Sequence, residues 1–279
     1  MTEKKKFKLS TIPTQIMVLF VSLLFMAPLY IVINYSFKTR RELFTGNPLA
    51  LPESFHFENY IRAFERLNLT TTFFNTIFYT VAAVAVLIII CGPAAWAIAR
   101  NKGKFYKILY IYFIIGIMIP AQALFLPMYI VGFNLGLVNT RPGVVFMFVA
   151  TNLSFGIFLL TSFMSTIPVE LEESARIDGC SIYKTYFLIV MPLLKPALAT
   201  LVIMQSFQIW NDYLMSSLFI STQSLRPMTV ALQALFSQHT SDYSTAFAAI
   251  VMFALPMVVL FVALQRYFIK GMTAGAVKG

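Results

Sequence analysis

Residues that could form a catalytic or metal site are scarce in this 279-residue sequence. Only 11% of its residues are charged, and it holds two histidines and two cysteines. The histidines, His56 and His239, provide almost no material for a metal site or for a Ser–His catalytic pair. Cys91 and Cys180 fit neither a metal-ligand spacing nor a disulfide framework. The sequence therefore argues against an enzyme, including a membrane-bound one, because no set of acid, base or metal converges.

A loop that could cradle the phosphates of ATP is also absent from the sequence. Such a loop ends in Gly-Lys followed by Ser or Thr, whereas the one Gly-Lys pair here, Gly103-Lys104, is followed by Phe105. We therefore expect the chain to bind no ATP and no other cofactor by itself.

Apolar residues, by contrast, are abundant: 59% of the chain is hydrophobic, and its mean hydropathy is +0.78. A soluble core cannot enclose so much apolar surface, so lipid is the expected solvent. Pro120 and Pro127 predict a kink or break within the third of six apolar stretches. The expected fold class is all-α, a polytopic membrane protein with six transmembrane helices of about 20 residues or more. They cover about residues 12–36, 73–99, 108–133, 143–164, 196–220 and 245–268.

Basic residues are distributed unequally between the two sides of these six helices. The side of the N-terminus carries 14 Lys and Arg residues, and the opposite side carries seven. The positive-inside rule therefore places both termini in the cytoplasm. This topology accounts for the net charge of +10 without a nucleic-acid partner.

The polar segment 165–192 interrupts the apolar second half of the chain on the cytoplasmic side. Its sequence predicts a first short helix in which Pro168 suits the first turn, and in which Glu172 pairs with Arg176 four residues later. Gly179 is expected to end this helix in a left-handed conformation.

A second short helix is expected after Gly179, with Ser181 as its N-cap and Pro192 at its end. The spacing of its aromatic and apolar residues predicts that Tyr183, Tyr186, Phe187 and Val190 share one face. Segment 165–192 therefore predicts a helix–Gly–helix elbow, which on composition alone is no more than a connector.

The spacing within this elbow resembles the EAA motif of ABC-importer membrane subunits. That pattern is Glu-Ala-Ala, three residues, Gly, nine residues, then Ile-x-Leu-Pro. Here it runs from Glu173 to Pro192, with Ser174 in place of an Ala and Met191 in place of the Leu. The resemblance implies that the elbow couples the membrane helices to an ATPase. The residues expected to do so are Glu172, Glu173, Ser174, Ala175, Asp178, Gly179, Ile189 and Pro192.

Further stretches resemble one subgroup of these importers, the maltose-type carbohydrate permeases, in particular their smaller six-span subunit. They include AAWAIARNKGKF at residues 94–105, IWNDYL at 209–214 and LQRYFIKGMTAGAVKG at 264–279. The resemblance implies a bacterial plasma-membrane importer of a carbohydrate, a di- or oligosaccharide. Its other parts would be a second, homologous permease, two ATPase subunits that hold ATP and Mg, and an extracellular or periplasmic sugar-binding protein.

The same resemblance implies a division of the chain into three parts. Residues 1–11 form a cytoplasmic tail, residues 12–269 form the permease domain in membrane lipid, and residues 270–279 form a second cytoplasmic tail. The second tail is expected to contact the ATPase through Thr273, Gly275 and Lys278.

Polar residues in the membrane helices are candidates for the translocation path. Gln205, Gln208 and Asp212 follow one another at i, i+3 and i+7, which predicts one helical face. Their amide and carboxylate groups suit sugar hydroxyls, but they suit hydrogen bonds between helices equally well. Both interpretations stay open. The candidate set is Gln122, Gln205, Gln208, Trp210, Asn211 and Asp212, with Trp210 as a surface for stacking against sugar.

Two alternatives to a sugar importer remain. An ion-driven secondary transporter needs paired ionisable groups within the membrane, but Asp212 is the one acidic residue inside an expected span. An ABC-importer permease for a solute other than sugar would share the elbow. ATP-dependent uptake that ionophores do not affect separates the importers from the ion-driven transporter.

Overall fold

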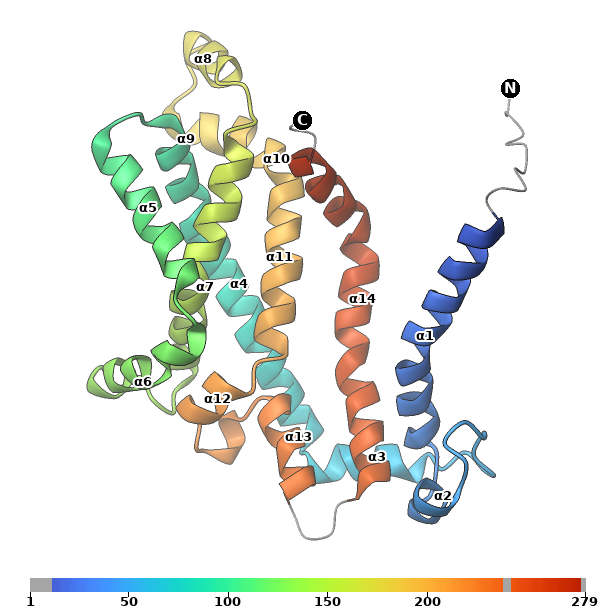
Figure 1. The fold of residues 1–279 in the computed structure, drawn as a ribbon. Coiled ribbons are helices and arrows are strands. Elements are labelled where there is room, and N and C mark those ends of the chain that lie inside the picture. The colour runs from blue at the N-terminus through green and yellow to red at the C-terminus, as the bar shows by residue number, and fades with distance from the viewer. Residues whose placement is uncertain (1–11, 238–241, 277–279) are drawn as a thin grey trace. The chain divides into compact units, whose positions relative to one another are not determined.

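The structure, a computed structural model, describes residues 12–237 and 242–276, and within these ranges the chain is helical without a strand (Figure 1). The α-helices are α1 (Ile12–Ser36), α2 (Arg40–Thr45), α3 (Glu58–Arg66), α4 (Leu69–Arg100), α5 (Lys104–Met118), α6 (Phe125–Asn134), α7 (Arg141–Met164), α8 (Glu170–Ile177), α9 (Ile182–Thr185), α10 (Met191–Leu193), α11 (Lys195–Trp210), α12 (Leu214–Phe219), α13 (Met228–Ser237) and α14 (Tyr243–Ala276). Two 3-10 turns, η2 (Ala121–Leu124) and η4 (Gln223–Leu225), and a π-helical segment, η3 (Tyr186–Val190), lie between them.

Several of these helices are long and apolar enough to cross a membrane. Four qualify singly, covering Pro13–Ser36, Leu69–Arg100, Arg141–Met164 and Tyr243–Gln265. Two further pairs qualify together but are bent: Lys104–Met118 with Ala121–Asn134 by 99°, and Ile182–Leu193 with Lys195–Trp210 by 70°. The described chain therefore has four to six candidate spans, and the first, α1, ends at Ser36 as expected from the sequence.

The chain divides into two compact units, Met1–Leu67 with Leu232–Ala254 and Asn68–Ala231 with Leu255–Gly279. In the first unit, α3 lies across the ends of α1 and α14 (Figure 1). Asn59 joins α3 to the end of α1, because its fully buried amide donates to the carbonyl oxygens of Ser36 at 2.9 Å and Lys38 at 3.0 Å. The rings of Tyr35 and Phe247 then pack edge to face at 5.2 Å.

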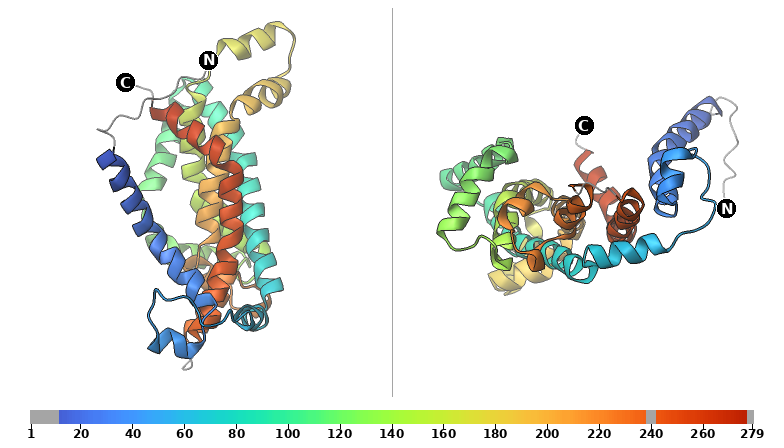
Figure 2. Two further views of the ribbon diagram at one scale, coloured as in Figure 1. Left: turned by 90° about the vertical axis from the view of Figure 1, so that its right-hand side faces the viewer. Right: turned by 90° about the horizontal axis from the view of Figure 1, so that it is seen from below.

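The core of the second unit lies among α4, α5, α7 and α11, of which α4, α7 and α11 run side by side (Figures 1 and 2). Small residues permit this close packing of α4 against α7. A Cβ atom on Gly156 would lie 2.6 Å from the Sγ atom of Cys91, so no larger residue fits there without movement. Cys91 thus serves as a buried apolar side chain.

The third apolar stretch is broken, as its prolines predict. Ile119 adopts an extended conformation (φ −76°, ψ 122°) because the ring of Pro120 disfavours a helical residue before it. The 3-10 turn η2 then redirects the chain into α6 (Figure 1).

The fifth stretch does not form the continuous helix expected for residues 196–220, because α11 ends at Trp210. Two side chains compete for backbone groups at this point. Asn211 Nδ2 donates to the carbonyl of Phe207 at 2.8 Å, and Asp212 Oδ1 accepts the N–H of Ser216 at 2.8 Å. Such local bonds replace the helical ladder and start α12 as a separate helix.

Candidate functional site

The segment that resembles the EAA motif forms two short helices joined at a glycine, at the end of the second unit remote from α12 (Figure 1). The first, α8, begins at Glu170, two residues after Pro168, so Pro168 precedes the helix rather than lying in its first turn. Its end is a Schellman motif: the N–H of Cys180 donates to the carbonyl of Ala175 at 2.9 Å, and that of Gly179 to Arg176 at 3.0 Å. Gly179 has φ +80°, as expected from the sequence.

The second part of the elbow starts as predicted, with the Ser181 hydroxyl accepting the N–H of Lys184 at 3.4 Å. It does not end at Pro192, however, because the helix passes through Pro192 to Leu193. The π-helical segment η3 directly precedes α10 and widens the turn. That widening accommodates a proline ring that would clash with the preceding turn of a regular α-helix.

The aromatic residues of this second part do not share one face. Tyr186 and Val190 are buried, whereas Tyr183 and Phe187 are 75% and 60% exposed. The wider π turn changes the angle between successive residues, so the spacing rule for an α-helix fails here. The elbow therefore has an apolar inner face and an apolar outer face.

A buried ion pair fixes the elbow to α4. The side chain of Glu172 is 1% exposed; its Oε1 accepts the Nε–H of Arg100 at 2.8 Å, and its Oε2 accepts the Nε1–H of Trp96 at 2.9 Å. Arg100 also donates to the carbonyl of Ile167 at 3.0 Å, just before α8. Glu172 thus pairs with a residue 72 positions away rather than with Arg176, as the sequence had suggested.

A ring contact extends this attachment to η3. The rings of Trp96 and Tyr186 lie 5.3 Å apart, and Tyr186 packs closely on the backbone of Gly92. We call Gly92, Trp96, Arg100, Glu172 and Tyr186 the clamp. Trp96 and Arg100 lie four residues apart at the polar end of α4, and this i, i+4 spacing was the one signal in the sequence that could have indicated their role. The clamp joins α8 and η3 to α4.

The remaining residues of the motif divide between the inside and the outside of the elbow. Glu173, Ser174, Asp178, Gly179 and Pro192 are exposed, Ala175 is buried, and Ile189 is half-buried. Large apolar side chains are exposed beside them, with Ile177 at 86% and Leu188 at 67%. The exposed residues form a mixed acidic and apolar surface, whereas Glu172 and Ala175 act from within the second unit.

The polar residues of the fifth stretch are not brought together on one face. Gln205 is 1% exposed, and neither polar atom of its amide has a hydrogen-bond partner among the described residues. Gln208 is exposed on the same helix, but Asp212 lies beyond its end, where its carboxylate accepts the N–H and the hydroxyl of Ser216. The predicted face of Gln205, Gln208 and Asp212 was therefore wrong, because the helix stops at Trp210.

Trp210 is not placed to stack on a ligand, because it is 3% exposed and packs edge to face against Phe73 at 5.9 Å. Asn211 and Gln122 are both exposed, the latter on η2. Of the tail residues, Thr273 and Gly275 lie in the last turns of α14, and Lys278 lies outside the described residues.

Comparison with known proteins identifies the family. The profile of the "Binding-protein-dependent transport system inner membrane component" family matches residues 89–274, which include the clamp, the elbow and α11. The chain belongs to this family. Its elbow is thus part of the inner membrane component of a transport system that depends on a binding protein.

Individual relatives of this inner membrane component cover nearly its whole length. It is 38% identical to the "Probable starch degradation products transport system permease protein AmyC" of Thermoanaerobacterium thermosulfurigenes, over 92% of this chain and 93% of the relative. It is also 38% identical to the "Melibiose/raffinose/stachyose import permease protein MelC" of Bacillus subtilis, over 90% and 91%.

Among solved structures, one chain from a bacterial ABC transporter involved in the import of the acidic polysaccharide alginate has a similar fold. The TM-score is 0.83 at 23% sequence identity, over 94% of this chain and 99% of that chain. The inner membrane component therefore has the fold of an ABC-importer permease.

Proposed function

We propose that the chain is a permease subunit that imports a di- or oligosaccharide, together with a second, homologous permease and two ATPase subunits. An extracellular or periplasmic protein would deliver the sugar. Support comes from relatives whose names specify starch degradation products and melibiose, raffinose and stachyose. ATP and Mg would bind to the ATPase subunits rather than to this chain, and the chain itself would catalyse no reaction.

The clamp is the observation that carries the coupling role. An ATPase can move the membrane helices only through an element that is fixed to them, and Glu172 fixes α8 to α4 through two hydrogen bonds and an ion pair. Because Glu172 is almost fully buried, its separation from Arg100 would leave a buried charge without a partner. A displacement of the elbow would therefore be passed to α4 rather than absorbed between them.

The outer face of the elbow is the proposed contact for the ATPase. It exposes Ile177, Tyr183, Phe187 and Leu188 in one short segment, next to the acidic residue Glu173. An apolar patch with a charged rim is typical of an interface between proteins. This surface would lie in the cytoplasm with both termini, as the excess of Lys and Arg on that side favours.

The second permease would complete the translocation path. Gln205 has a buried amide without a partner among the described residues, and a membrane protein rarely retains such a group unsatisfied. Because both amide atoms are enclosed, only a bound water or a conformational change that exposes the side chain could satisfy them. Gln205→Leu should therefore change sugar affinity if such a change turns the amide into the path, and should change assembly alone if it turns the amide toward the second permease.

The test is uptake of labelled raffinose and maltotriose into vesicles that contain both permeases, the ATPases and the sugar-binding protein. The expected result is uptake that requires ATP, is unaffected by ionophores and disappears without the second permease. Proton-driven uptake by this chain alone would support the secondary transporter instead. ATP-dependent uptake of a non-sugar solute, with no uptake of any oligosaccharide, would contradict the proposed substrate class alone.

A further inference from the structure

A polar pocket of about 450 Å³ lies in the first unit, where α3 crosses the beginning of α14. It is separate from the clamp and from the polar residues of α11, both of which belong to the second unit. Its lining is mainly basic and hydrogen-bonding: Thr39, Arg40, His56, Glu58, Asn59, Arg62, Arg66, Asp242 and Ser244.

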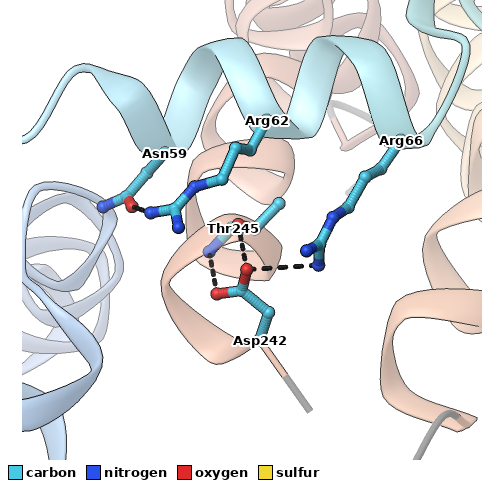
Figure 3. Close-up of polar contacts among 5 residues, drawn as sticks. All are labelled: Asn59, Arg62, Arg66, Asp242 and Thr245. Atoms are coloured by element: carbon cyan, nitrogen blue, oxygen red, sulfur yellow. Dashed lines mark hydrogen bonds and ion pairs between the residues drawn. The ribbon is translucent and has the colours of Figure 1, made fainter. Parts of the chain in front are cut away.

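Positive charge exceeds negative charge in this pocket. Figure 3 shows Arg66 directed at Asp242, with 3.2 Å between Nη1 and Oδ2. Asp242 also accepts the N–H and the hydroxyl of Thr245 at 3.3 and 2.7 Å, so its carboxylate accepts three hydrogen bonds and caps α14. Arg62 instead donates to the neutral amide of Asn59 (Figure 3).

Two guanidinium groups of the lining therefore form no salt bridge with any described residue, although the charge of Arg62 acts on Asp242. Neither Arg40 nor Arg62 forms a salt bridge within residues 12–237 and 242–276, although both line the pocket and are exposed. Glu58, the other acid of the lining, offsets only one of these charges. Such guanidinium groups present paired donors that match phosphate and carboxylate oxygens.

Ser244 independently points to a ligand site at this pocket. Its side chain is 1% exposed, and its hydroxyl has no hydrogen-bond partner in the described part of the chain. A buried hydroxyl without a partner is unfavourable, and buried polar groups are normally paired. A ligand oxygen that accepts from Ser244 as well as from arginine would satisfy it.

The surroundings place the pocket at the boundary of a membrane. It lies where two candidate spans meet polar chain, α1 ending at Ser36 and α14 beginning at Tyr243. On α3, Ile61 and Phe64 are 59% and 48% exposed, while Arg62 and Arg66 line the pocket. A short helix with an apolar and a basic face is typical of one that lies along the lipid headgroups.

We propose that this pocket binds the phosphate of an anionic phospholipid, held by the guanidinium groups of Arg40 and Arg62 and by the hydroxyl of Ser244. The acyl chains would lie along the exposed apolar residues next to it. This position favours a lipid over an acidic side chain of another protein, because the charged donors and the apolar surface adjoin each other at the level of the headgroups. The lipid would hold α3 against the ends of α1 and α14.

The test uses the complete transporter, reconstituted in nanodiscs of phosphatidylcholine with and without phosphatidylglycerol, and then returned to detergent. Native mass spectrometry measures the phosphatidylglycerol that each complex retains. Arg62→Gln and Ser244→Ala should each lower this retention, and Arg62→Gln at least about tenfold, the effect of one lost hydrogen bond to a charged group. The matched control is Arg41→Gln, which removes the same charge from an exposed neighbour that does not line the pocket.

Several results would overturn the proposal. One is equal retention by the wild type, both pocket variants and the control. Displacement of the lipid by inorganic phosphate as efficiently as by a short-chain phosphatidylglycerol would identify a site for free phosphate. A photo-crosslinker at Ile61 that captures the sugar-binding protein rather than lipid would identify a docking surface for that protein. Thermal unfolding of each variant establishes that a loss of lipid is not a loss of folding.

Discussion

The buried carboxylate of Glu172 allows a sharp test of the coupling role. Glu172→Gln keeps the shape of the side chain and one oxygen acceptor but removes the charge. It leaves the guanidinium of Arg100, whose side chain is 16% exposed, without its counter-ion. Removal of one partner from a buried pair costs about 3–5 kcal/mol. Because glutamine can still accept one of the two bonds, we expect a smaller cost of about 1.5–3 kcal/mol.

Hydrogen exchange measures this cost where it arises. If α8 opens more easily from α4, amides of residues 170–180 should exchange roughly 10- to 100-fold faster, the factor that corresponds to that free energy. Amides in the middle of α7 should be unaffected. In vesicles, sugar uptake per ATP hydrolysed should fall, since the elbow then moves without α4.

The control for this variant is Glu170→Gln on the same helix. Glu170 is exposed, so its neutralisation should change stability by no more than about 0.5 kcal/mol. Trp96→Phe, which removes only the Nε1–H donor, should show non-additive effects with Glu172→Gln because both act on one network. If Glu172→Gln behaves as Glu170→Gln does in both exchange and uptake, the clamp does not transmit motion and our reasoning is wrong.

Three further variants test other parts of the structure. Gly179→Val should destabilise the elbow by about 1–3 kcal/mol, because β-branched residues are strained at positive φ. Gly179→Asn should be tolerated, and hydrogen exchange of the amides of residues 170–180 distinguishes the two variants. Gly92→Ala should lower the melting temperature, because its Cβ would collide with the hydroxyl of Tyr186, and Tyr186→Phe should restore it. Asp242→Asn should lower the melting temperature at neutral pH, and the difference from the wild type should shrink as the pH falls below about 4 and vanish only below the depressed pKa of the folded state.

The sign of the Asp242 prediction follows from its surroundings. Burial acts to raise the pKa of this carboxyl, but hydrogen bonds from Thr245 and the positive charges of Arg62 and Arg66 hold its pKa below the usual value. A depressed pKa stabilises the folded state above the pKa of the unfolded chain, and this contribution is lost as the pH falls through the folded value. A constant difference between Asp242→Asn and the wild type from neutral to acidic pH would contradict this explanation.

The contrast between Gly92 and Gly179 serves as a control for the glycine variants. A Cβ on Gly179 would meet nothing within 4 Å, so its requirement is one of backbone conformation alone. Gly92 lies within α4 and has an ordinary helical backbone, so a larger residue is excluded there by the closeness of Tyr186. If Tyr186→Phe failed to rescue Gly92→Ala, the close packing of η3 on α4 would not be the cause of the instability.

The sequence by itself determined the features that depend on neighbouring residues. Its first apolar stretch ends at Ser36 as α1 does, because length and hydropathy suffice to define a membrane helix. Pro120 breaks the third stretch and Gly179 ends α8, because proline and glycine act on their own backbone. The motif from Glu173 to Pro192 identified the family, since spacing along the chain is preserved in the sequence.

Only the tertiary structure decided where the polar side chains of the elbow point. Glu172 has Arg176 four residues away and Arg100 far away in the chain, and local spacing favours the first. The distant pair forms instead because burial of Glu172 between α8 and α4 requires donors on α4, and Trp96 and Arg100 supply them. The π-helical segment η3, which buries Tyr186 and exposes Phe187, and the end of α11 at Trp210 were also not predicted, although the hydrogen bonds of Asn211 and Asp212 beyond Trp210 are local. For Glu172, by contrast, a hydrogen bond and an ion pair with another element outweigh a preference of the local chain.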